Sequence, residues 1–210
     1  MSNKELFTEI INYIDNLHRD IGQMVLLIEQ SMEENNYRSP MGGRASGEIT
    51  SHYTKPEGWR IPYIYRLFIP VDPSVTTYSI FYLVMLQTDS AFNFPPIICA
   101  KVNHPPFTES EVSSQIVWGI NVRSLARKES SWSKFQVENG WSIAATPKHN
   151  TQVVSVQGYI LNLFDMTDQQ RVIDNIVTPL LNPDRNLDDM RTVDKYVFPP
   201  LEIGNEPDNT

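Results

Sequence analysis

Apolar residues recur at alternating spacings of three and four through residues 7–28, which is the repeat of one helix face. They are Phe7, Ile10, Ile14, Leu17, Ile21, Met24 and Ile28. Ser2 and Glu5 have the spacing of a capping box, in which each side chain accepts a hydrogen bond from a backbone N–H at the helix start. The pattern predicts a long helix beginning beside the N-terminus.

This apolar stripe is wider than the seam of a coiled coil. It is widened by Leu6, Ile11, Tyr13, Val25, Leu27 and Met32. Such residues occupy the flanking e and g positions, which a two-stranded coiled coil normally fills with charge. The width favours a helix packed on its own sheet or bundle over free pairing of two helices, which stays open as an alternative.

Strand patterns begin beyond a stretch rich in proline and glycine, within which residues 48–53 predict one short strand. Residues 61–71 and 77–88 are dense in β-branched and aromatic side chains, and Asp72-Pro73-Ser74 between them is typical of a turn. We expect an antiparallel pair at the centre of a sheet, because both faces of these segments are apolar.

A shorter strand is predicted at residues 97–102, after Pro95 and Pro96. We expect His104-Pro105-Pro106 to end it, and the sheet with it, because proline cannot donate a ladder hydrogen bond. Residues 107–150 show no clear period, apart from an extended candidate at 116–125 and a hairpin-type turn at Asn139-Gly140.

Residues 153–164 fit either a strand or one face of a helix, and propensity slightly favours the strand. Thr167 and Gln170 form a second capping-box pattern ahead of a helix that runs to Leu181. The remaining residues, 183–210, are polar and acidic apart from an apolar patch at 196–201, a candidate docked or partner-binding peptide. We therefore predict a single α+β domain at residues 1–182 with an acidic tail at 183–210.

Charge is distributed unevenly along the 210 residues. Residues 1–37 carry a net charge of −5, residues 38–150 carry +3 and residues 151–210 carry −6, which sum to −8. Acidic ends around a mildly basic middle argue against nucleic acid as a partner. No long apolar run or secretory leader is recognisable, so we expect a cytoplasmic protein that does not bind membranes.

Recognisable reaction chemistry is sparse in the sequence. Cys99 lies in an apolar run and is expected to be a buried thiol. The histidines, at 18, 52, 104 and 149, lack partners at metal-ligand spacing, and we predict no metal or other cofactor. An enzyme site assembled from His52, His104 and Glu48 is kept as an alternative.

The order of elements, with Pro95 and Pro96 before a strand, His104 and Pro105 after it and Trp141 beyond, resembles the ubiquitin-conjugating fold. The resemblance implies an N-terminal helix, an antiparallel four-stranded meander and C-terminal helices, although the long helix predicted here is about twice the family's usual length. It also favours a helix at residues 151–164 over the strand that propensity suggests, and we adopt the helix.

The departures from that family bear on function. Asn121 or a near neighbour stands where the family has its catalytic cysteine, and Pro106 replaces the family's oxyanion asparagine. The resemblance therefore implies a non-catalytic binding or scaffold protein whose partner is a ubiquitin-like protein or an activating enzyme. The alternative function is homo-oligomeric assembly, as a homodimer, through the first helix.

Overall fold

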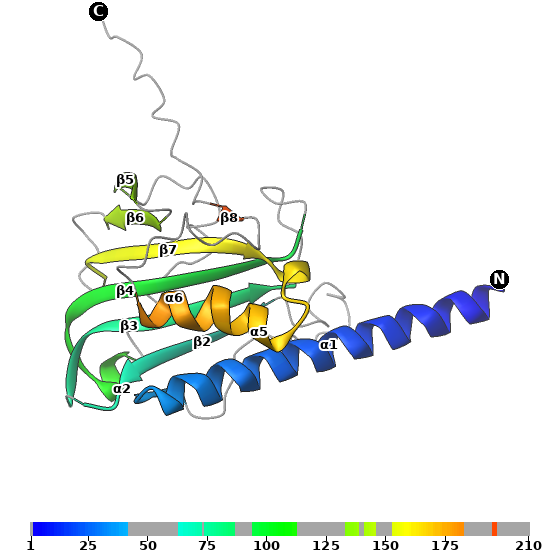
Figure 1. The fold of residues 1–210 in the computed structure, drawn as a ribbon, viewed down its shortest axis with the longest axis horizontal. Helices are drawn as coiled ribbons and strands as arrows, with labels where there is room; N and C mark the ends of the chain where they lie inside the picture. Colours follow the sequence, from blue (N-terminus) through cyan, green and yellow to red (C-terminus); the bar gives the residue numbers. More distant parts are fainter. Residues whose placement is uncertain are drawn as a thin grey trace, which may run out of the picture.

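The structure of the chain is a computed structural model that describes residues 2–41, 63–72, 74–86, 94–112, 133–138, 141–145, 153–182 and 195–196. Its described elements are α1 (Asn3–Glu34), β1 (Tyr37–Arg38), β2 (Tyr63–Pro70), β3 (Val75–Met85), β4 (Pro96–Thr108), α2 (Glu109–Glu111), β5 (Ser133–Glu138), β6 (Trp141–Ala145), β7 (Ser155–Asn162), η3 (Leu163–Asp165), α5 (Gln169–Val172), η4 (Ile173–Val177), α6 (Thr178–Leu181) and β8 (Lys195–Tyr196). The chain is an α+β protein with helices before and after an antiparallel sheet (Figure 1). The predicted strand at 48–53 and extended segment at 116–125 lie outside the described residues.

The first helix begins with the predicted capping box. The Ser2 backbone N–H donates to the Glu5 carboxylate at 2.6 Å, and the Glu5 N–H donates to the Ser2 hydroxyl at 3.3 Å. After Glu34 the chain reverses through Asn36, whose φ of 62° is the left-handed conformation that asparagine tolerates better than most residues. The sequence prediction of a long N-terminal helix is confirmed.

The described strands form one antiparallel sheet in the order β1-β2-β3-β4-β7-β6-β5, and β8 also pairs with β7. The predicted pair is β2 and β3, with Leu67 opposite Phe81. The sheet does not end at β4 as predicted, because β7 pairs along eight residues of β4, from Pro96 opposite Asn162 to Asn103 opposite Ser155.

The His-Pro-Pro segment does not end β4 as predicted. Tyr78 pairs with Asn103 and Thr76 pairs with Phe107, so His104, Pro105 and Pro106 together face a single residue of β3. This bulge takes the prolines out of the regular ladder, where their missing N–H groups would leave carbonyls unpaired. The strand therefore continues to Thr108.

The prediction of a helix at residues 151–164 is wrong. Residues Ser155–Asn162 form strand β7, which pairs with β4 on one side and with β6 and β8 on the other. Propensity, which favours strand for this segment, gives the right answer, and the family resemblance that outweighed it does not.

The C-terminal helix begins one residue later than its capping-box pattern indicates. Asp168, not Thr167, is the N-cap and accepts from the Arg171 N–H at 2.9 Å. Three contiguous pieces, α5, η4 and α6, carry the helix to Leu181, and η4 is one turn of π-helix. Pro179 lies near the C-terminal end of this continuous helix, where it has no N–H to donate to the carbonyl of Asn175.

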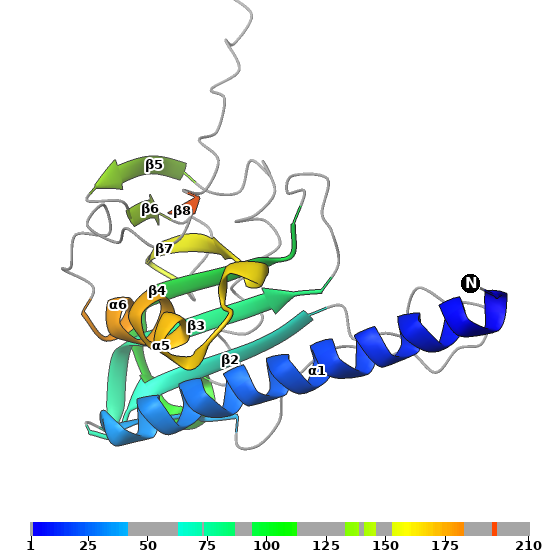
Figure 2. The ribbon, with the colours of Figure 1, turned by 45° about the vertical axis from the view of Figure 1, so that its right-hand side comes forward.

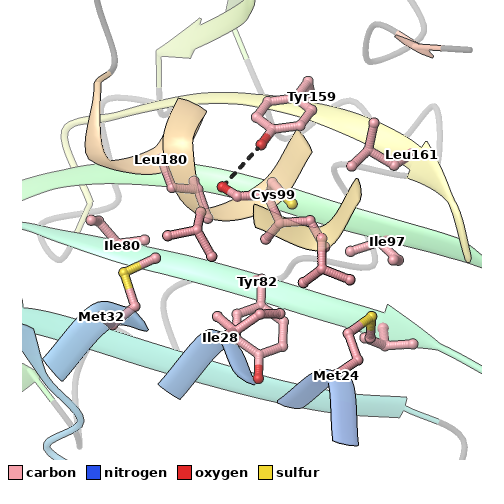
Figure 3. Close-up of a cluster of buried hydrophobic side chains, with 14 of the residues drawn as sticks. Met24, Ile28, Met32, Ile80, Tyr82, Ile97, Cys99, Tyr159, Leu161 and Leu180 are labelled. Atoms are coloured by element: carbon pink, nitrogen blue, oxygen red, sulfur yellow. Dashed lines mark hydrogen bonds between the residues drawn. The ribbon is translucent and has the colours of Figure 1, made fainter. Parts of the chain in front are cut away.

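Both long helical segments cover the same face of the sheet. In the two ribbon views, α1 and the helix α5–α6 lie side by side across β2, β3 and β4 (Figures 1 and 2). Between them and the sheet lies a core that includes Ile28, Met32, Ile80, Ile97 and Leu180 (Figure 3). A second buried cluster, built on Leu67, Phe81, Ile98, Val156 and Ile160, lies on the opposite face.

One ion pair is buried in the helix-side core. The Arg66 guanidinium of β2 contacts the Glu29 carboxylate of α1; the Arg66 side chain is 5% exposed and that of Glu29 is 23% exposed. Burial lowers the pKa of Arg66, since desolvation disfavours its charged form. The pair therefore fixes the position of α1 on β2 at a cost in desolvation.

Removal of one partner of this pair should be costly. We expect Glu29→Ala to lower the free energy of unfolding by on the order of 3 kcal/mol, because it leaves the Arg66 charge buried without its carboxylate. The double variant Glu29→Leu/Arg66→Met should recover most of that loss. Urea unfolding of the three proteins measures both effects, and a Glu29→Ala loss below about 1 kcal/mol would show that the ion pair does not hold α1.

Candidate functional site

The family-motif residues do not converge on one site. Pro95 and Pro96 lead into β4, and the Pro95 carbonyl accepts from the Leu163 N–H at 2.9 Å. His104 lies eight residues further along the same strand, about 26 Å away at the rise of a β-strand. Trp141 begins β6. Asn121, the position matched to the family's catalytic cysteine, lies outside the described residues, as do His52 and Glu48.

A row of polar side chains crosses the helix-covered face instead. Arg66, Tyr82, Cys99 and Tyr159 stand opposite one another on the neighbouring strands β2, β3, β4 and β7. Trp141 continues the row, with its ring edge-on to Tyr159 at 5.1 Å between centroids. The sequence predicts each strand but not this alignment, which depends on the registers of three separate pairings.

The two tyrosines of the row differ in their surroundings. The Tyr159 hydroxyl donates to the Asn175 carbonyl at 2.7 Å, within the π turn of η4 (Figure 3 shows the ring among the core residues). A π turn releases carbonyls from the ordinary helical pattern, and this hydroxyl binds one of them. The Tyr82 hydroxyl is buried close to α1, and burial raises its pKa above the ordinary tyrosine range.

Cys99 lies in the middle of the row and is fully buried. Burial raises the pKa of its thiol to about 12, against a smaller opposing effect of hydrogen bonding to Tyr159. Because the thiolate is the nucleophilic form, this sulfur is unreactive at neutral pH. The described residues of the row therefore form a packed part of the interior.

Thiol labelling tests this reading of Cys99. We expect native protein at pH 8 to resist an aromatic disulfide reagent and to react fully once unfolded in guanidinium chloride. Above about pH 9 the unfolded thiol ionises while the folded one keeps its proton, so the Cys99 contribution to stability should fall as pH rises through the window between 9 and 12. Rapid labelling of native protein at pH 8 would contradict the buried assignment.

His104 lies in the bulge of β4 and is also buried. Its ring stacks on Phe107 at 5.3 Å between centroids, and its Nδ1–H donates to the Pro105 carbonyl at 2.8 Å. Burial lowers the pKa of His104, while backbone groups of Pro105 and Tyr78 act in the opposite direction. The imidazole therefore fills the bulge as a neutral ring.

The neutral ring should make stability depend on pH. Below about pH 6.5 an unfolded histidine takes up a proton that folded His104 resists, so its contribution is present above that pH and is lost as pH falls. We expect wild-type stability to decrease more steeply between pH 7.5 and pH 5 than that of His104→Leu, measured by urea unfolding. Parallel pH profiles for the two proteins would show that His104 does not titrate in this way.

Exposed apolar side chains gather on the first half of α1. They are Leu6, Phe7, Ile10, Ile11, Tyr13 and Ile14, with between 40% and 65% of their surface exposed. Both ribbon views show this part of the helix running beyond the sheet (Figures 1 and 2). We call residues 3–20 the overhang, since the buried positions of α1 begin at Ile21.

The sequence predicted the apolar face of α1 but not that its N-terminal part extends beyond the sheet. The wide stripe indicates packing on the protein's own sheet, which holds for Ile21, Met24, Ile28 and Met32. Leu17 is partly covered by the same core, and from Ile14 toward the N-terminus the repeat continues without that cover. Periodicity identifies the face of a helix that seeks burial but does not say where along the helix the sheet stops.

Other classes of site lack support in the described part of the chain. No cluster of three or more histidine, cysteine or acidic side chains there could hold a metal ion. Within the same residues, no helix combines the length and the apolar character needed to cross a bilayer.

Comparisons with known protein families, with curated proteins and with solved structures found no match for this chain.

Proposed function

We propose that this chain is a non-catalytic binding protein that acts through protein–protein contacts, and that the overhang of α1 is its contact surface. The observation that carries the proposal is the set of six large apolar side chains exposed on one stretch of a rigid helix. Contiguous apolar surface of this kind marks interaction sites, whereas single exposed apolar residues are ordinary.

The interior supports a binding role over a catalytic one. The cysteine nucleophile is buried and protonated, and the buried histidine is held by its own bulge. Neither residue can reach a substrate without opening the core. A recognition helix, by contrast, needs only an exposed apolar face with anchors at helical spacing, which Phe7, Ile10 and Ile14 provide.

A finer proposal is that the fold is of the ubiquitin-conjugating type and that the partner is a ubiquitin-like protein or an activating enzyme. It is supported by the helix that precedes strands β1 to β4 and by Pro95 and Pro96 ahead of β4. The continuation of the sheet through β7, β6 and β5 is the feature that this proposal must accommodate.

Charge placed on the overhang should abolish partner binding without unfolding the protein. Ile10→Glu/Ile14→Glu puts two carboxylates into the apolar face, and Asn12→Glu/Asn16→Glu puts two on the opposite side of the same helix as the matched control. Pull-downs from native lysate, quantified by mass spectrometry, should lose the specific partners of the wild type with the first variant and keep them with the second. Retention of every partner by the first variant would overturn the proposed surface.

A further inference from the structure

The geometry points to a second copy of this chain as the partner that covers the overhang. The two overhangs would pack as antiparallel helices, related by a two-fold axis at the level of Asn12. The inference rests on the proposed function, which makes the overhang a protein contact surface, and adds which protein fills it and in which direction.

The exposed residues continue the face that α1 uses against its own sheet. Five helical turns span about 18 residues, so positions 18 apart point in the same direction. Ile10 and Ile14 are 48% and 40% exposed, whereas their counterparts Ile28 and Met32 are completely buried. The exposed face of the overhang is therefore as apolar as the face that α1 buries against the sheet, and the ionised side chains of the overhang lie on other sides of the helix.

The body of the protein decides the direction of a partner helix. From Ile21 onward, the sheet and the C-terminal helix occupy the face in question. If two copies paired in parallel across this face, both bodies would need the same space between the helices. In an antiparallel pair, each body lies beyond the other copy's N-terminus, and both are accommodated.

The lengths of the two segments also match. When Asn12 of one chain is level with Asn12 of the second chain, residue 3 of each helix is level with residue 21 of the other. Each N-terminus then ends where the partner's face becomes covered by its own body. The overhang is about 27 Å of helix, and its exposed apolar residues, from Leu6 to Ile14, all fall within the paired length.

The same register brings apolar side chains together. Ile10 becomes level with Ile14 of the second copy, and Phe7 with its Leu17, whose side chain is already partly covered by its own core. Ile11 and Tyr13 each lie near their own counterparts at the centre. Between Leu6 and Leu17 the charged and amide side chains, such as Glu9, Asn12 and Asp15, fall on the outer side of the helix.

The buried area is sufficient for a specific contact. Six partly exposed large side chains contribute on the order of 100 Å² each, so two copies would bury about 1,200 Å². That is the lower end of the range for stable interfaces. The positions that flank the centre of this face are apolar, whereas a two-stranded coiled coil usually has charged residues there.

Sedimentation velocity over a range of concentrations tests self-association directly. We expect the wild type and Asn12→Glu/Asn16→Glu to shift from a species of 24.1 kDa toward twice that mass as concentration rises. Ile10→Glu/Ile14→Glu should remain monomeric. A wild type that stays monomeric at every concentration would overturn the inference, and so would association that persists in the first Glu variant.

Disulfide trapping tests the direction. A mixture of Phe7→Cys and Leu17→Cys proteins should form a mixed disulfide dimer under mild oxidation, while Phe7→Cys alone should not, because its two sulfurs would lie about 15 Å apart along the axis. Efficient dimers of Phe7→Cys alone would indicate a parallel pair and overturn the antiparallel arrangement.

The two proposals fail in distinguishable ways. A monomeric wild type whose lysate partners are lost in Ile10→Glu/Ile14→Glu would overturn the second-copy inference and leave the proposed contact surface intact. Lysate partners retained by that variant would overturn the proposed function, whatever the state of association.

Discussion

The arrangement of this molecule depends on the burial of one face of α1, from Ile21 to Met32, against the sheet. That contact turns a helix of 32 residues into two parts with different roles. The second part closes the core together with the C-terminal helix. The first part is held in a fixed direction, because it continues the same helix without a break, and its apolar face stays outside the body. The ion pair between Glu29 and Arg66 adds one specific polar contact between α1 and β2 to an otherwise apolar interface.

The polar row beneath the helices shows why buried polar residues need not indicate an active site. Tyr159 binds a helix carbonyl, Arg66 pairs with a carboxylate, and Cys99 remains a protonated thiol among apolar neighbours. Each group has a packing or hydrogen-bonding role, and none is exposed. In the described part of the chain, the overhang is where exposed apolar side chains are concentrated.

Local signals predicted local structure well. The capping box at Ser2 and Glu5 and the pairing of β2 with β3 appear as expected, and β4 begins at Pro96, one residue before its predicted start. Features that depend on contacts between distant segments could not be predicted from these local signals. A bulge carries His104-Pro105-Pro106 through β4. At residues 155–162 local propensity indicated the strand correctly, and the family resemblance replaced it with a helix. The register that aligns Tyr82 with Cys99 and the point where α1 leaves the sheet depend on contacts between distant segments, which a single sequence does not display.

The edge of β7 has a consequence for the solubility of the folded chain. One side of β7 pairs with β4, and the other is divided between β6, which takes residues 155–158, and β8, which takes Ile160 and Leu161. An apolar strand with an open row of N–H and C=O groups is a template for pairing with other chains and for fibril growth. Lys195 and Tyr196 pair with Leu161 and Ile160, so a short segment of the acidic C-terminal region occupies backbone groups of β7 that would otherwise be open to another strand.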